Sequence, residues 1–116
     1  MATIAESTTG QVDERFDNKF RTVNTDTTTA RTISASDIGA VIVSNNGSSV
    51  TFTIPESTAT AGKVFPIGSS FRVCTKGAGT VTVAKTGSDT LTGTATVAQG
   101  ATKLCVKIAA TEWFIG

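Results

Sequence analysis

A chain of 116 residues fits one domain and can bury a core without a metal or a disulfide. Ten basic and nine acidic side chains leave a net charge of +1, which argues against a nucleic-acid partner and against an acidic tail. The first residues, "MATIAESTTG", lack the basic start and apolar stretch of an ordinary signal peptide, and nowhere do eighteen apolar residues run together, so we expect neither secretion by such a signal nor a membrane span. Histidine, the usual general base and the commonest metal ligand, does not occur.

The first 21 residues are richer in charged side chains than the rest of the chain, which is rich in Thr, Val, Ala, Gly and Ser. They are expected to form an arm that precedes a β-rich domain at 22–116. In this arm "VDERFDNKF" places Val12, Phe16 and Phe20 at steps of four, which predicts one stripe of a short amphipathic helix. A helix of two to three turns is marginal in water by itself. The stripe is therefore expected to pack, either on its own domain or on a neighbouring subunit.

Beyond the arm the hydrophobic period changes to two, as in "SVTFTI" and "TVTVA", with threonine on the outward face. Clusters of Gly, Ser, Asn and Asp separate these runs and are typical of turns. The pattern predicts an all-β fold, a small antiparallel β-sandwich or barrel of about eight or nine strands. The expected strands are 30–34, 40–44, 49–54, 69–75, 79–84, 89–92, 94–97, 101–109 and 112–115, and those between 86 and 99 are the least defined.

Two strands raise the question of which side chains face the core. "AVIVS" can bury either of two alternating sets, and if Val41 and Val43 face outward they need a partner, which would indicate oligomerisation. In "KLCVKI" we expect Leu104, Val106 and Ile108 to face inward.

Because alternate residues of a strand face opposite sides, this expectation and the inward Phe71 and Val73 place both cysteines of the chain, Cys74 and Cys105, on the outward side of their strands. Structural thiols are the favoured interpretation, and a disulfide between them is the alternative.

The sequence "KGAGTVTVA" contains two glycines that could bind a phosphate or reverse the chain. A dinucleotide-binding loop requires a third glycine and a following helix, and neither is present here. We therefore expect Gly77 and Gly79 to adopt positive φ values in a hairpin between two antiparallel strands.

Catalytic chemistry finds little support in the sequence. The few carboxylates of the domain are scattered among turns and strand ends, where Asp ordinarily caps or turns the backbone. A glycosidase would pair its carboxylates with sugar-binding aromatics, yet the chain has one Trp and no Tyr. We predict no catalytic, metal-binding or cofactor-binding residues.

Five segments, "DIGAVIVSNN", "VTFTIP", "FPIGSSFRV", "GAGTVTVA" and "VKIAATEWFIG", follow one another along the chain. In this order they resemble a small β-rich domain of tailed-bacteriophage virion proteins, found in tail fibres and other surface structural proteins. Proline belongs at strand ends or edges, and a large aromatic side chain closes a core. The resemblance covers about residues 30–116, and its structural anchors are Pro55, Pro66, Gly68, Gly77, Gly79 and Trp113.

The resemblance implies a structural protein of the virion. Since a short arm accompanies the domain and no fibrous shaft is present, the leading hypothesis is a capsid decoration (cement) protein. It would assemble in the host cytoplasm as a homotrimer and bind the major capsid protein at the capsid surface, with Val12, Phe16 and Phe20 reaching a neighbour. The alternative is a tail-associated or fibre-tip protein that contacts the host surface through polar turns such as "SNNGSS" and "KTGSD".

Overall fold

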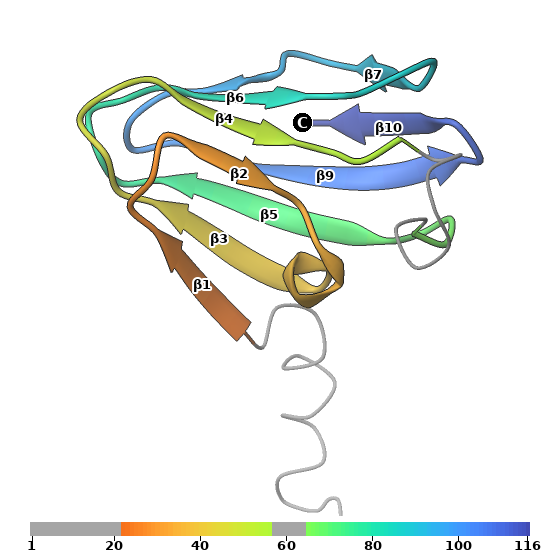
Figure 1. The fold of residues 1–116 in the computed structure, drawn as a ribbon, viewed down its shortest axis with the longest axis horizontal. Helices are drawn as coiled ribbons and strands as arrows, with labels where there is room; N and C mark the ends of the chain where they lie inside the picture. The colour runs from red at the N-terminus through yellow and green to blue at the C-terminus, as the bar shows by residue number, and fades with distance from the viewer. Residues whose placement is uncertain (1–21, 57–64) are drawn as a thin grey trace, which may run out of the picture.

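The computed structural model describes residues 22–56 and 65–116, and in these residues it confirms the all-β class (Figure 1). Ten strands and one 3₁₀ helix are present there, which is slightly more than the sequence pattern predicts. In chain order the elements are β1 Thr22–Asp26, β2 Ala30–Thr32, η1 Ala35–Asp37, β3 Ala40–Ser44, β4 Val50–Thr53, β5 Ser70–Thr75, β6 Val81–Ala84, β7 Thr90–Thr92, β8 Thr96–Val97, β9 Thr102–Ala109 and β10 Glu112–Ile115.

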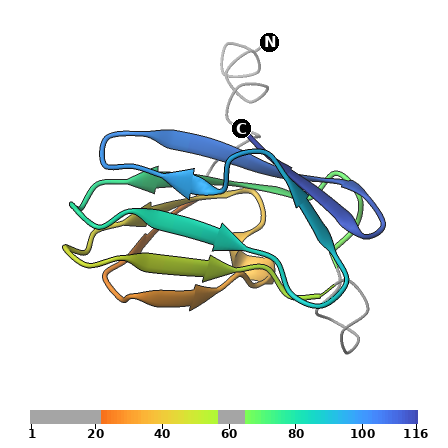
Figure 2. The same cartoon turned by 90° about the horizontal axis from the view of Figure 1, so that it is seen from above.

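The strands form two sheets with one hydrophobic core between them. The six-stranded sheet has the order β1-β3-β5-β9-β10-β7, and the four-stranded sheet has the order β2-β4-β6-β8. Figure 2 shows β2, β4 and β6 lying side by side as one layer. The architecture is therefore a β-sandwich.

The first six strands alternate strictly between the two sheets, so the chain winds as a coil of three turns. Within each sheet these strands run parallel: β1, β3 and β5 in one, and β2, β4 and β6 in the other. The expected antiparallel pairing occurs only between β5 and β9, β9 and β10, and β6 and β8. Short connections normally indicate hairpins, but here they cross between layers, and each strand pairs with the second one along the chain.

The turns of successive coils stack on one another at one end of the sandwich. The side-chain amide of Asn46 donates to the carbonyl of Thr27 at 2.7 Å, and the Gly79 amide donates to the carbonyl of Asn46 at 2.8 Å. A Cβ atom at Gly77 would overlap the backbone of Asn46, and one at Gly79 would overlap the carbonyl of Ser48. Glycine is required here by this close approach of two backbones.

The predicted Gly77–Gly79 hairpin is therefore wrong in two respects. The two strands that the turn connects, β5 and β6, lie in different sheets. In addition, neither glycine has a positive φ.

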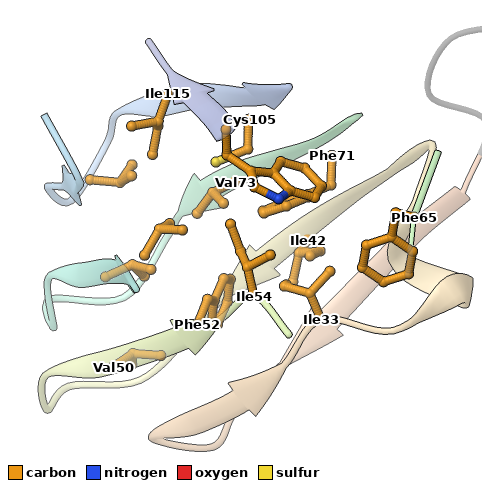
Figure 3. Packing of buried hydrophobic residues seen from close by; sticks show 14 residues of the cluster. Ile33, Ile42, Val50, Phe52, Ile54, Phe65, Phe71, Val73, Cys105 and Ile115 are labelled. Atoms are coloured by element: carbon orange, nitrogen blue, oxygen red, sulfur yellow. The ribbon is translucent and has the colours of Figure 1, made fainter. Parts of the chain in front are cut away.

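The core fills the space between the sheets (Figure 3). Trp113 is 1% exposed and packs against the rings of Phe65 and Phe71, with centroid distances of 6.2 and 5.9 Å. Burial of such side chains removes apolar surface from water and is the main favourable term of folding. The other buried apolar members are Ile33, Ile42, Val50, Phe52, Ile54, Val73, Val81, Val83, Val97, Cys105 and Ile115.

The two prolines lie outside regular strands, where the lack of an amide hydrogen removes no hydrogen bond of a strand ladder. Pro55 comes after β4, and Pro66 begins a tight turn that leads into β5. The Pro66 carbonyl accepts from the Ser69 amide at 3.0 Å and from its hydroxyl at 2.6 Å. Gly68 has a φ of 95° in this turn, a value that residues other than glycine rarely adopt.

The threonine-rich segment 86–99 contains the two expected strands, and they belong to different sheets. β7 pairs with β10 in the six-stranded sheet, whereas β8 pairs with β6 in the four-stranded sheet. Gly93 lies between them with a φ of 113°, and a Cβ atom there would overlap the carbonyl of Ile115. This glycine therefore allows the chain to cross from one layer to the other.

Candidate protein-binding face

Strand β9 faces the opposite way from the sequence expectation. Cys105 and Lys107 point toward the core and are 0% and 3% exposed, while Leu104, Val106 and Ile108 lie on the other side. The reason is the partner strand β10, in which the large side chains Trp113 and Ile115 take the core positions.

Register then decides the orientation of β9. Residues directly opposite each other in an antiparallel pair share a face, and Lys107 is opposite Trp113 while Cys105 is opposite Ile115. The buried Lys107 ammonium donates to the carbonyl of Phe65 at 2.6 Å, which compensates part of its desolvation.

As a result, the side of the six-stranded sheet that points away from the core, called here the outer face, is largely apolar. Val23 of β1, Ile108 of β9 and Phe114 of β10 are 62%, 47% and 45% exposed. Half-buried apolar side chains lie between them on the same face. The apolar members of the outer face are Val23, Val41, Val43, Leu104, Val106, Ile108 and Phe114.

Most of these side chains lie in two cross-strand rows, the first of which also contains Arg72. One row runs from Val23 through Val41 and Arg72 to Leu104. A second row places Val106 directly opposite Phe114. Side chains of neighbouring strands on one face are in contact range, so the members constitute one patch.

The exterior of the four-stranded sheet is different in kind. Its solvent-facing positions are occupied mainly by threonine, as in β4, β6 and β8, with Thr51, Thr82 and Thr96 exposed. Threonine has a high strand propensity and keeps a hydroxyl in water. The threonine-coated exterior that the alternation predicts is therefore present on one side of the sandwich, and the apolar outer face is on the other.

A second site brings buried charges together at the end of the core formed by the first coil. Asn24, Asp26 and Arg31 occupy positions that pair with Ile42, Ser44 and Phe52 of the next coil and therefore point inward. We call Asn24, Asp26, Arg31 and Asp37 the polar cluster.

Arg31 connects the two carboxylates of the polar cluster. Its guanidinium lies 2.9 Å from a carboxylate oxygen of Asp26 and 2.6 Å from one of Asp37, and these two residues are 6% and 0% exposed. Asp37 also accepts from the amide of Ser34 at 3.1 Å and from the side chain of Asn24 at 2.9 Å.

The electrostatics of the polar cluster argue against acid–base catalysis. Burial raises the pKa of Asp37, but hydrogen bonds from Arg31, the Ser34 amide and Asn24 outweigh it and hold this pKa below the ordinary 3.8. Burial likewise raises the pKa of Asp26, but hydrogen bonds from Thr28 and Arg31 outweigh this effect and hold the pKa below 3.8. A general acid at neutral pH needs a raised pKa. Both carboxylates instead stay ionised, and their ion pairs with Arg31 lie at one end of the core.

The two cysteines are free thiols on opposite sides of the six-stranded sheet. Cys74 lies on the outer face as expected, and its thiol donates to the hydroxyl of Thr102 at 3.5 Å. Cys105 faces the core, where burial raises the pKa of its thiol to about 12. This orientation excludes a disulfide between the two cysteines in this fold.

The structure separates the two polar turns that the sequence suggested for host contact. Residues 45–49 precede β4 and lie in the stacked turns, whereas residues 85–89 follow β6 at the other end of the parallel strands. Glu56, just after β4, accepts from the Ser88 amide at 3.1 Å, which holds the second turn at that end. A single ligand site cannot use both turns. Val12, Phe16 and Phe20 of the arm lie outside the described residues.

Among residues 22–56 and 65–116, no group of three or more acidic or thiol side chains could hold a metal ion. In the same part of the chain, no helix has the length and apolar character needed to cross a membrane. Comparison with known proteins found no matching family model, no matching curated protein and no matching solved structure. The bacteriophage resemblance therefore stays a prediction from the sequence.

Proposed function

We propose that this protein is a non-enzymatic structural protein that joins protein subunits within a larger assembly. The observation that supports this function is the outer face, where seven apolar side chains share one side of one sheet. A contiguous exposed apolar patch is typical of a protein-binding surface. The threonine exterior on the opposite side gives the molecule one side suited to a partner and one suited to water.

The specific form that we propose is a capsid decoration protein of a tailed bacteriophage, with the major capsid protein as partner. The resemblance of five segments to phage virion domains supports this form, as does the combination of a small domain with an arm that has its own apolar stripe. Two contact surfaces on each copy allow several weak contacts to be made at once. Simultaneous contacts hold an assembly far better than one contact of the same strength.

Binding of purified protein to heads that lack it tests this function. We expect the wild-type protein to cosediment with such heads and Ile108→Asp on the outer face to bind at least tenfold more weakly. Ile67→Asp is the matched control, because Ile67 is 64% exposed but lies in the turn before β5. Equal binding by both variants would remove the outer face from the proposal, and absence of wild-type binding would refute the decoration role.

The second candidate, a tail-associated or fibre-tip protein, is favoured by the stacked turns. Asn46, Ser48 and Gln99 bring polar side chains to this end of the sandwich, and Gln99 continues the stack by donating to the Lys76 carbonyl at 3.2 Å. Because these amides bond to the backbone of neighbouring turns, contact with a hydroxyl-rich ligand would fall to the exposed residues beside them, Asn45, Ser48 and Ser49. Immunogold labelling of virions separates the candidates, since label over the head supports decoration and label over the tail supports host contact.

A further inference from the structure

We propose that the outer face of one copy binds residues 12–20 of a second copy of the same chain. This inference rests on the proposed structural function and deepens it by naming the partner of one row of the outer face, from Val23 to Leu104. Val106, Ile108 and Phe114 of the same face are left for the capsid protein. It uses two features: an apolar patch on the described sheet, and an apolar stripe predicted by the sequence of the arm. The remaining question is why the arm should come from another copy.

The sequence leaves a short connection between the predicted stripe of the arm and β1, which disfavours packing of the arm on its own sheet. The predicted stripe of Val12, Phe16 and Phe20 extends to position 20, and β1 begins at Thr22. Only Arg21 remains as a connection, whereas connections between a helix and the strand that it packs against usually have about 2–6 residues. We therefore expect the predicted helix to extend beyond its own sheet, where a neighbouring copy is within its reach.

The dimensions of the stripe fit the outer face. Val12 and Phe20 are eight positions apart, which corresponds to about 12 Å along a helix. The row from Val23 on β1 to Leu104 on β9 crosses three strand spacings, or about 14 Å. The stripe of a single short helix therefore spans most of this row.

The size of the face also favours a short segment over a second outer face. From β1 to β10 the sheet is four spacings wide, about 19 Å, and a five-residue strand is about 17 Å long. The product, about 320 Å², is less than half of the roughly 800 Å² per partner that a stable protein interface buries. Packing of two outer faces alone would be too small, whereas arm exchange adds the arm contacts of every copy. When each arm binds the next copy, a rotation that closes after three copies gives a ring, which is the form that the predicted homotrimer requires.

Cys74 offers a native probe, because it lies on the outer face while Cys105 is buried in the core. We expect Cys74 of the full chain, at concentrations where it is assembled, to react with a thiol reagent at least tenfold more slowly than Cys74 of Phe16→Asp. Asn18→Asp is the matched control, since it adds the same charge to the arm away from the stripe, and its Cys74 should stay protected. Size-exclusion chromatography should show a smaller particle for Phe16→Asp only.

Dilution distinguishes binding of the arm of a second copy from binding of the arm of the same chain. Protection that disappears as the full chain is diluted to monomer supports exchange, and protection independent of concentration overturns it. A disulfide in Phe16→Cys between position 16 and Cys74 should give covalent dimers and larger species, which Cys74→Ser abolishes; a purely intramolecular disulfide overturns the inference. Equal reactivity of Cys74 in the wild type and in Phe16→Asp also overturns it.

The result is separable from the test of the proposed function. If Cys74 is equally reactive in all variants but the wild-type protein binds heads, only the arm exchange fails. If Cys74 is protected by a second copy but the protein binds no virion, only the decoration role fails.

Discussion

Replacing Arg31 with Met tests whether the polar cluster stabilises the end of the core. The substitution keeps an unbranched side chain of similar length but removes the cation between Asp26 and Asp37. Removing one partner of a buried ion pair commonly costs about 3–5 kcal/mol. Arg31 is 24% exposed, and Asn24 and the Ser34 amide still donate to Asp37, so we expect a loss near the lower bound, about 3 kcal/mol at pH 7.

The loss should depend on pH in a defined direction. In the wild type the pKa of Asp37 lies below its ordinary value, so its contribution to the free energy of unfolding is full above pH 3.8 and disappears as the pH falls through the lowered value. Without Arg31 the raising effect of burial is less opposed, and the folded state takes up a proton more readily. The difference between the wild type and Arg31→Met should therefore be smaller at pH 3 than at pH 7.

Urea unfolding at pH 7 and pH 3, followed by circular dichroism, measures both values. Lys76→Met is the control for removal of an exposed positive charge, and it should change the free energy of unfolding by no more than about 0.5 kcal/mol. Adding Asp37→Asn to Arg31→Met should recover part of the stability at pH 7, because Asp26 is then the one buried carboxylate of the polar cluster left without its cation. A loss below about 1 kcal/mol at pH 7, or an equal loss at both pH values, would refute the reasoning.

Three further predictions concern the core and the stacked turns. Trp113→Ala should lower the free energy of unfolding by about 3–5 kcal/mol, measured by urea unfolding, whereas Phe114→Ala, which is 45% exposed, should cost far less. Gly79→Ala should lower the melting temperature because its Cβ overlaps the Ser48 carbonyl, and Gly47→Ala should leave it nearly unchanged because nothing lies within 4 Å of a Cβ there; equal melting temperatures would contradict the close approach. Cys105 should react with a thiol reagent only after denaturant is added, since its pKa of about 12 leaves almost no thiolate at pH 8, and rapid reaction of both thiols in the native protein would disprove its burial.

Alternation of apolar residues was sufficient to identify the residues of β4, β5 and β6 that form the centre of the core. Val50 and Phe52, Phe71 and Val73, and Val81 and Val83 are at most 1% exposed. In these strands only one of the two alternating sets is apolar, so the pattern has one interpretation. The turn at Pro66 and Gly68 was predictable for a similar reason, because proline and a positive-φ glycine have few alternatives.

The pattern failed where both alternating sets could be buried or where the inward set is polar. In β9 either set contains an apolar residue, and only the register with Trp113 decides that Cys105 and Lys107 face the core. In β1 the inward positions carry Asn24 and Asp26, so no alternation indicates a strand.

The parallel coil was also beyond the sequence pattern. The connections at 27–29, 45–49 and 76–80 have the length and composition of hairpin turns. Whether a short turn reverses a strand within a sheet or carries it to the opposite sheet depends on contacts with the preceding coil, which the local sequence does not contain.

The outer face was only partly foreseeable. The ambiguous run "AVIVS" indicated that Val41 and Val43 need a partner if they face outward, and both do lie on the outer side. The larger contribution from β9 was assigned to the core instead, and the exposed Phe114 next to it follows from the burial of Trp113. The usable signal is Trp113 in β10. Because this large side chain must be buried, it fixes which face of β10 points to the core, and the register then fixes the orientation of β9.

The winding of the first six strands has a consequence for how the molecule opens. Each coil rests on the next one along the chain, and among the described residues the first coil has a neighbouring coil on one side only. In stacked structures the stability of a unit depends on its nearest neighbours, so fraying should begin at β1 and β2, while β5, held between β3 and β9, should exchange its amide protons last. A subunit that contacts its neighbours near β1 would thus stabilise the least stable part of its own fold when it assembles.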